Sequence, residues 1–178
     1  MSTAASVSPE GLPADLEIDL AIESDGWPDV VALQALTRRA VDAAFRIAGL
    51  KTAPHSELSL VFLDDTGIRE LNNTWRDKDK PTNVLSFPGG EPEGDVYGPL
   101  LGDIVFALET VKLEAEELGI PFNDHFTHLV VHGTLHLFGY DHQIDAEAEV
   151  MEGLERRILE HLGIADPYAD VPLAADAE

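Results

Sequence analysis

The sequence predicts an α+β protein of one domain, in which a small mixed four-stranded sheet is packed by about five helices. Segments with the two-residue alternation of strands are interleaved with amphipathic helical segments over short connections. That order favours a sheet with parallel pairs and a covering of helices. The 178 residues, 44% hydrophobic and 25% charged, match a single globular domain with a substantial core.

The first half of the domain is expected to hold two strands, each followed by a helix. Residues 16–22 alternate apolar and polar side chains, and residues 57–63 form a second strand. A helix over 28–48 has a proline in its first turn and stops at Gly49. A short helix over 64–75 begins with an Asp-Asp-Thr run that supplies N-cap chemistry.

The second half is expected to contain two short strands and three helices. The strands are 84–87 and 101–106, separated by a flexible acidic loop over 88–99. Helix 108–118 follows, and helix 147–162 ends the fold. The expected buried face of that last helix consists of Val150, Leu154, Ile158 and Leu162.

Between these two helices, a helix over 125–138 is expected to be central and buried. Asn123 or Asp124 is expected to cap it, and Gly139 to end it. Because apolar residues lie on opposite sides of its helical wheel, little of its surface can face water. Those residues are Phe126, Leu129, Val130 and Leu137 on one side and Val131, Leu135 and Phe138 on the other.

The ends of the chain differ in composition from the domain, which is expected over 16–168. Residues 1–15 are predicted to be a disordered tail, and residues 169–178 a disordered acidic one. No apolar run approaches the roughly 18 residues of a membrane helix, and the first basic residue is Arg38, so neither a membrane partner nor a secretory signal is expected. With no cysteine, the chain suits a reducing compartment, and a cytoplasmic location is expected.

The charge is strongly acidic, since 11 basic and 34 acidic residues give a net charge of −23. Such a field repels nucleic acids, so an RNA substrate must meet a local basic patch, and no DNA partner is expected. Four basic residues fall within one short window over 69–80. They are Arg69, Arg76, Lys78 and Lys80.

Three histidines have the spacing of metal ligands. His132 and His136 lie one helical turn apart on the same face, and a turn at Gly139 can bring His142 back toward them. Three imidazoles without a fourth protein ligand leave a coordination position open, as in catalytic zinc sites. The other histidines considered, His55, His125, His128 and His161, are expected to be core residues that are hydrogen-bonded to a neighbour.

The spacing of the three histidines is also that of a zinc metalloprotease signature. In that signature, a glutamate after the first histidine removes a proton from the metal-bound water. This chain has Gly133 at that position, and glycine can transfer no proton. A zinc peptidase therefore stays open as an alternative, but it would need a base from elsewhere.

Four motifs, taken together, resemble the YbeY family of bacterial rRNA maturation factors. They are HGTLHLFGYDH over 132–142, KDKPTNVLSFP over 78–88, LGDI over 101–104 and DPY over 166–168. The resemblance covers residues 16–168. It implies a zinc-dependent, single-strand-specific endoribonuclease that acts in 16S rRNA maturation, ribosome assembly and ribosome quality control. Ribosomal or small-subunit assembly proteins are implied as further partners.

The resemblance assigns one Zn²⁺, or another divalent transition metal, to His132, His136 and His142. It also implies a catalytic role for Arg76, because a functionally important arginine precedes the KDKPTNV run in the family. A guanidinium can bind two phosphate oxygens and offset charge that grows at phosphorus.

Several further residues are candidates for the site. Lys78 and Lys80 are expected to guide the RNA strand, and Asn83 either contacts substrate or caps its loop. Asp103 and Asp141 either accept hydrogen bonds from metal-bound imidazoles or have ordinary turn or cap roles. A ribosome-assembly binding factor with a structural metal and no activity stays open as a second alternative.

Overall fold

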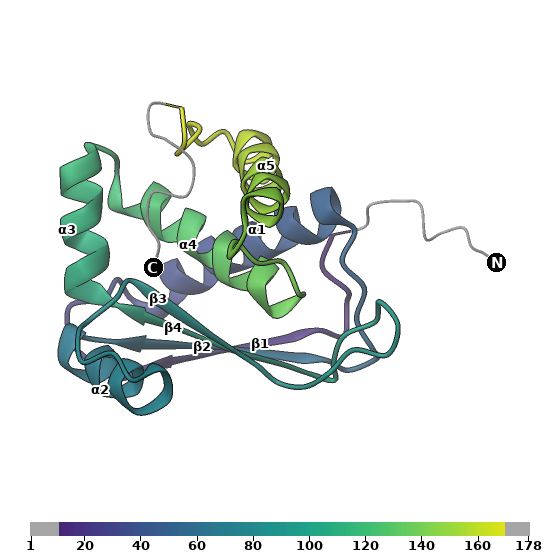
Figure 1. Cartoon of the computed structure of the whole chain (residues 1–178), viewed down its shortest axis with the longest axis horizontal. Helices are drawn as coiled ribbons and strands as arrows, with labels where there is room; N and C mark the ends of the chain where they lie inside the picture. Colours follow the sequence, from purple (N-terminus) through teal and green to yellow (C-terminus); the bar gives the residue numbers. More distant parts are fainter. Residues whose placement is uncertain (1–10, 170–178) are drawn as a thin grey trace.

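The computed structural model describes residues 11–169, which form a four-stranded sheet with helices on both faces (Figure 1). The strands are β1 (Glu17–Ile22), β2 (Glu57–Leu63), β3 (Val84–Pro88) and β4 (Leu100–Ala107). The helices are α1 (Val30–Ala48), α2 (Asp65–Arg76), α3 (Leu108–Leu118), α4 (Phe122–Leu137) and α5 (Asp145–His161). The predicted fold class is confirmed, and each predicted element is present with small changes at its ends.

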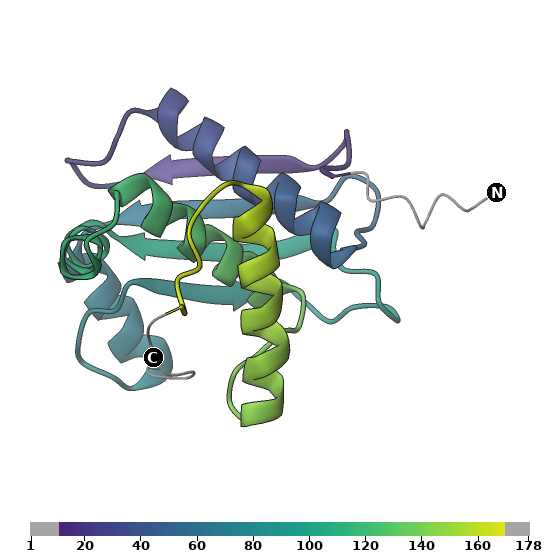
Figure 2. The ribbon, with the colours of Figure 1, turned by 90° about the horizontal axis from the view of Figure 1, so that it is seen from above.

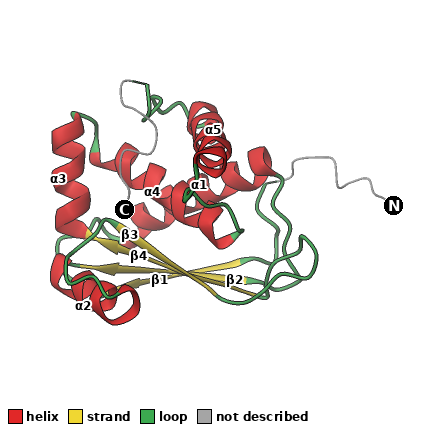
Figure 3. Ribbon diagram, viewed as in Figure 1, coloured by secondary structure: helices red, strands yellow, loops and turns green. Residues whose placement is uncertain are grey.

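The sheet is mixed, with strand order β1-β2-β4-β3. The pairs β1–β2 and β2–β4 are parallel, whereas the edge strand β3 runs antiparallel to β4. Helices α1 and α4 pack on one face of the sheet with α5 outside them, and α2 lies on the other face (Figure 3). Helix α4 also contacts the edge strand β3.

The core lies between the sheet and α4. Phe62 of β2 stacks on Phe106 of β4, and Phe126 of α4 packs against both rings. Trp27, in the loop before α1, packs on this group and donates a hydrogen bond to the carbonyl oxygen of Leu63 at 3.0 Å. Burial on nearly all sides confirms that α4 is the central helix of the fold.

Helix α4 begins earlier than the sequence indicates. Its N-cap is Pro121, so neither Asn123 nor Asp124 caps it. The carbonyl oxygen of Pro121 accepts hydrogen bonds from the backbone of Asp124 and His125, both at 3.1 Å. The additional turn places Phe122 against Trp27 and parallel to Phe126, and these aromatic contacts favour the longer helix.

The buried face of α5 agrees with the predicted one except at its first residue. Val150 is 58% exposed, whereas the buried side is formed by the residues around Met151, Glu155 and Ile158. Two glutamates, Glu152 and Glu155, lie on this buried side. Of the predicted face, Ile158 is buried and Leu154 and Leu162 pack against the core, so only Val150 is misplaced. A hydrophobic pattern ignores the buried acids beside this stripe.

Two segments make more contacts than the sequence analysis expects. Residues 11–15, assigned there to the tail, contact the domain: the backbone of Leu12 donates to Asp42, and Asp15 accepts from the backbone of His55. The 88–99 loop contains Tyr97, whose ring packs on Phe138 of the core. The rest of the two expected tails, 1–10 and 170–178, lies outside the described residues.

At Gly133 the backbone of α4 lies tightly against the sheet. A Cβ atom at this position would lie 2.7 Å from Cγ2 of Ile104, a fully buried side chain of β4. A contact that short forces the core to move. The absence of a side chain at position 133 is therefore a packing requirement of the fold.

We expect Gly133→Ala to lower the free energy of unfolding by about 1–3 kcal/mol, the usual cost of overpacking. The matched control is Gly153→Ala on α5, where a Cβ meets nothing within 4 Å. That variant should be neutral or slightly more stable, because alanine favours helix over glycine. Urea unfolding of both variants measures the difference, and equal stabilities would contradict the packing role of Gly133.

Candidate metal centre

His132, His136 and His142 come together at the C-terminal end of α4. One ring nitrogen of each lies within 4.8 Å of one from each of the others. The ring centroids are 4.7 Å apart for His132 and His136, 5.3 Å for His132 and His142, and 5.0 Å for His136 and His142. The three side chains are only partly buried, so a ligand can approach them. The structure thus brings together the three histidines that the spacing predicts.

A Schellman turn delivers His142 to this cluster. The backbone N–H of Gly139 donates to His136 O at 3.0 Å, and that of Tyr140 donates to Leu135 O at 3.1 Å. Gly139 has φ 92°, a conformation that favours glycine. Asp141 Oδ1 then accepts the backbone N–H of His142 at 2.7 Å. Within residues 11–169, the Asp141 side chain bonds to this backbone N–H and to no imidazole, so it shapes the turn.

Burial and the two neighbouring imidazoles lower the pKa of His136 to about 4. The ring is therefore neutral at neutral pH, with a lone pair free to bind a metal ion. A cluster of three neutral nitrogen donors suits a borderline ion such as Zn²⁺.

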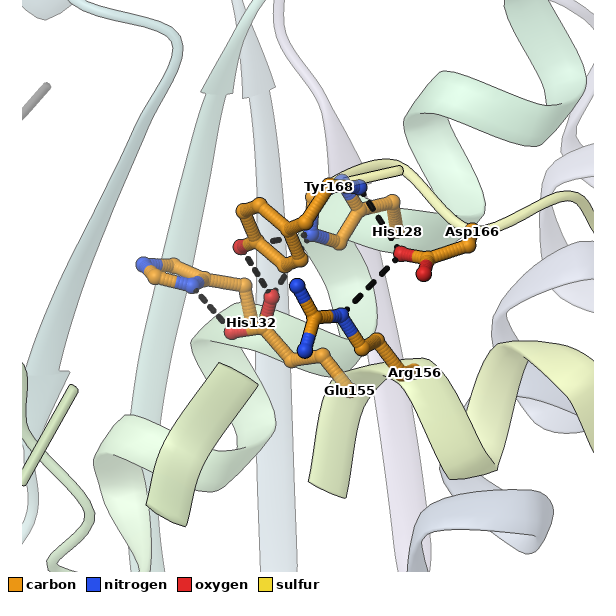
Figure 4. A network of polar contacts seen from close by, with 6 residues as sticks. All are labelled: His128, His132, Glu155, Arg156, Asp166 and Tyr168. Atoms are coloured by element: carbon orange, nitrogen blue, oxygen red, sulfur yellow. Dashed lines mark hydrogen bonds and ion pairs between the residues drawn. The ribbon is translucent and has the colours of Figure 1, made fainter. Parts of the chain in front are cut away.

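A buried glutamate that sequence reasoning missed supports the cluster. Glu155 of α5 is fully buried, and its Oε2 accepts a hydrogen bond from Nδ1 of His132 at 2.7 Å (Figure 4). Its Oε1 lies 2.7 Å from Nε2 of His128, one turn earlier on α4. Burial alone would raise the pKa of Glu155, but the hydrogen bonds from His128 and His132 outweigh it and lower the pKa. The carboxylate stays ionised and fixes the His132 ring.

Asp103 is not part of this arrangement. It is exposed on β4, between Gly102 and Ile104. Since Ile104 points into the core beside α4, strand alternation directs Asp103 to the opposite face of the sheet. The acid beside the metal-ligand candidates is therefore Glu155 of α5, and not Asp103 of β4.

Arg76, Lys78 and Lys80 follow one another at the end of α2 and in the loop before β3. All three are exposed, and among residues 11–169 their side chains form no hydrogen bond or ion pair. The acid between the two lysines, Asp79, is bound by Arg69 at 2.8 Å. The three cations are therefore free to meet a polyanion.

Asn83 has a structural contact. Its side-chain amide donates to Glu114 Oε1 at 3.0 Å, and the same oxygen lies 2.8 Å from Nε2 of His125. This network ties the start of β3 to α3 and α4. The geometry favours the capping alternative for Asn83 over direct contact with substrate.

The remaining histidines divide into two kinds. His125 and His128 are hydrogen-bonded to glutamates within the fold, as expected. His55 and His161 are exposed, so the expectation that they belong to the core is wrong. The first of these sits at a left-handed turn, with φ 56°.

Removal of one cluster histidine should abolish metal binding. We expect His136→Ala to lose the approximately one divalent ion per chain that a three-histidine site retains. Elemental analysis of protein purified without chelator measures it, with the exposed His161→Ala as the control that keeps its metal. Full metal content in His136→Ala, together with loss in His128→Ala, would show that the ligands are assigned wrongly.

The chain is similar in sequence to a known family of proteins. Residues 23–163 match the family model described as Endoribonuclease YbeY. A protein of that name from Allorhizobium ampelinum is 55% identical over 159 residues, 86% of this chain and 95% of the relative. Another from Sinorhizobium fredii is 54% identical over 163 residues, 88% of this chain and 94% of the relative.

A solved structure shares the fold as well. The solution structure of TM1509 from Thermotoga maritima is 26% identical, has a TM-score of 0.51 and covers 85% of this chain and 97% of its own.

No helix within residues 11–169 is both long and apolar enough to cross a membrane. Since the family model spans most of the chain, and relatives more than half identical cover nearly all of it, the chain belongs to the Endoribonuclease YbeY family.

Proposed function

We propose that the protein is a metal-dependent endoribonuclease that cleaves single-stranded RNA and acts in 16S rRNA maturation, ribosome assembly and ribosome quality control in the cytoplasm. The observation that carries the proposal is the cluster of three histidine nitrogen donors, two from α4 and one from the turn after it, with no fourth protein ligand beside it in the described chain. Relatives that share most of the sequence are named endoribonucleases.

The residues present fit one Zn²⁺ ion. The chain supplies three imidazoles, and Glu155 fixes one of them by a hydrogen bond, as the outer partners of zinc-bound histidines do. When bound, such an ion polarises a phosphate oxygen and lowers the pKa of a bound water to about 7.

The chain's own residues then position the substrate. Arg76 is proposed to hold the scissile phosphate with its guanidinium, while Lys78 and Lys80 guide the strand. Asn83 contributes by anchoring the loop that carries these cations to α3. Unpaired RNA suits a small acidic protein with one local basic segment, because a flexible strand can bend to meet it.

The two alternatives are weaker on structural grounds. A peptidase of the metalloprotease type needs a carboxylate at position 133, but that position packs against Ile104 and leaves no room for a side chain. A purely structural metal would normally have four protein ligands, and the described residues offer three in this cluster.

One experiment separates the three functions. Purified protein is assayed for metal content and for cleavage of labelled single-stranded RNA, duplex RNA and casein, each with and without chelator. We expect chelator-sensitive cleavage of single-stranded RNA alone. Casein cleavage would support the peptidase, and stoichiometric metal without any cleavage would support the binding factor.

Arg76 is expected to act on the reaction and not on the fold. Because the side chain is exposed and unpaired within the described part of the chain, Arg76→Ala should change stability by less than about 0.5 kcal/mol. Loss of one charge-stabilising donor should slow single-turnover RNA cleavage about 100- to 1,000-fold, and Arg76→Lys should recover part of the rate.

The matched control for Arg76 is Arg38→Ala, which removes an exposed arginine from α1. It should cleave at the parental rate. Melting temperature and metal content are measured for every variant. If a folded, metal-loaded Arg76→Ala protein cleaves RNA as fast as the parent, Arg76 has no part in the mechanism.

RNA binding should depend only weakly on salt. Each phosphate contacted on a single strand contributes about −0.7 to the slope of log affinity against log salt, so three contacts give about −2. Lys78→Ala should make the slope shallower by about 0.7. A much steeper slope in the parent would reveal a larger basic surface than the 76–80 segment.

A further inference from the structure

The last described residues return to the metal-ligand helix. From the end of α5 the chain turns back over α4 (Figure 2), and we call residues 164–168 the C-terminal segment. Its start is fixed by a hydrogen bond of 2.8 Å from the backbone of Ile164 to Leu159 O. Farther along, Asp166 accepts from the backbone of Tyr168 at 2.8 Å and from Arg156 Nε at 3.3 Å. The DPY motif is thus a folded turn held on α5.

This turn directs the Tyr168 side chain toward α4. The ring meets His128 edge to face, with centroids 5.6 Å apart, and Arg156 lies over it at 5.5 Å. The hydroxyl donates a hydrogen bond to Glu155 (Figure 4). Burial raises the pKa of Tyr168, and the negative charge of Glu155 raises it further. The hydroxyl therefore stays protonated and can donate a hydrogen bond.

Glu155 therefore has three hydrogen-bond partners from two other parts of the chain. Within residues 11–169, His128 and Tyr168 share Oε1, and His132 is bonded to Oε2. A carboxylate accepts hydrogen bonds only, so Nδ1 of His132 carries the proton. Its lone pair is then on Nε2, the nitrogen that would bind a metal ion.

We propose that Tyr168 is a positioning residue for the metal centre: by holding Glu155, the C-terminal segment sets the tautomer and orientation of the His132 imidazole. The inference rests on the metal site of the proposed function. Because two binding events that favour the same arrangement strengthen each other, metal affinity and docking of the C-terminal segment are coupled.

The test compares Tyr168→Phe with the parent. This change removes one hydroxyl and keeps the ring that packs on His128 and Arg156. We expect Zn²⁺ affinity, measured by competition with a chromogenic chelator, to fall about 10-fold, the low end for loss of an outer partner. The matched control is Tyr140→Phe: the Tyr140 hydroxyl forms no hydrogen bond within residues 11–169, and this variant should bind Zn²⁺ like the parent.

A second readout uses the metal-free protein. Ring ¹⁵N shifts of His132 should show Nδ1 protonated in the parent and a mixture of tautomers in Tyr168→Phe. Glu155→Gln, which can still accept one hydrogen bond, should shift the tautomer further. If Tyr168→Phe does not fold, the parent's ring shifts still decide: a His132 with its proton on Nε2 overturns the proposal.

The outcomes also separate this inference from the proposed function. A parent that binds no divalent metal and cleaves no RNA refutes the function. A parent that does both, with a Tyr168→Phe variant of unchanged Zn²⁺ affinity and unchanged His132 shifts, refutes only the role of Tyr168. Equal loss of affinity in Tyr140→Phe would refute it too.

Discussion

The buried carboxylate of Glu155 is the interaction on which the candidate site depends. An ionised acid without solvent is costly unless donors surround it, and here the donors come from α4 and from the C-terminal segment. Loss of a partner from a buried charged network typically costs about 3–5 kcal/mol. The charge of Glu155 therefore holds α4, α5 and the C-terminal segment together. One of its three contacts orients His132, a metal-ligand candidate.

The packing of α4 explains why the histidines are where they are. A helix buried on nearly all sides has a single strip open to solvent, and His132 and His136 lie on that strip. On its buried side, Gly133 lets the helix backbone approach Ile104. The residue after His132 is thus determined by core packing, which leaves no room for a catalytic glutamate at position 133.

Much of the fold was predictable, because strand alternation and helix stops are local signals. The three histidines were also predictable, since their spacing alone brings them together through a turn at Gly139. Glu155 was not, because its position depends on how α5 rotates against α4. One sequence signal did exist: Glu155 lies four residues after Met151 and four before Leu159, both fully buried. An acid between apolar residues at helical spacing indicates a buried partner.

The basic window shows a second limit of sequence reasoning. Along the chain, acidic residues alternate with the basic ones, and only the structure shows that one of these acids, Asp79, is bound by Arg69. Arg76, Lys78 and Lys80 form no ion pair within residues 11–169, on a protein whose net charge is −23. Against such a background, a strand gains affinity only where it meets these cations. Under the proposed function, the same acidity directs a bound strand to the 76–80 segment, which leads into β3, the edge strand that contacts the histidine-bearing helix.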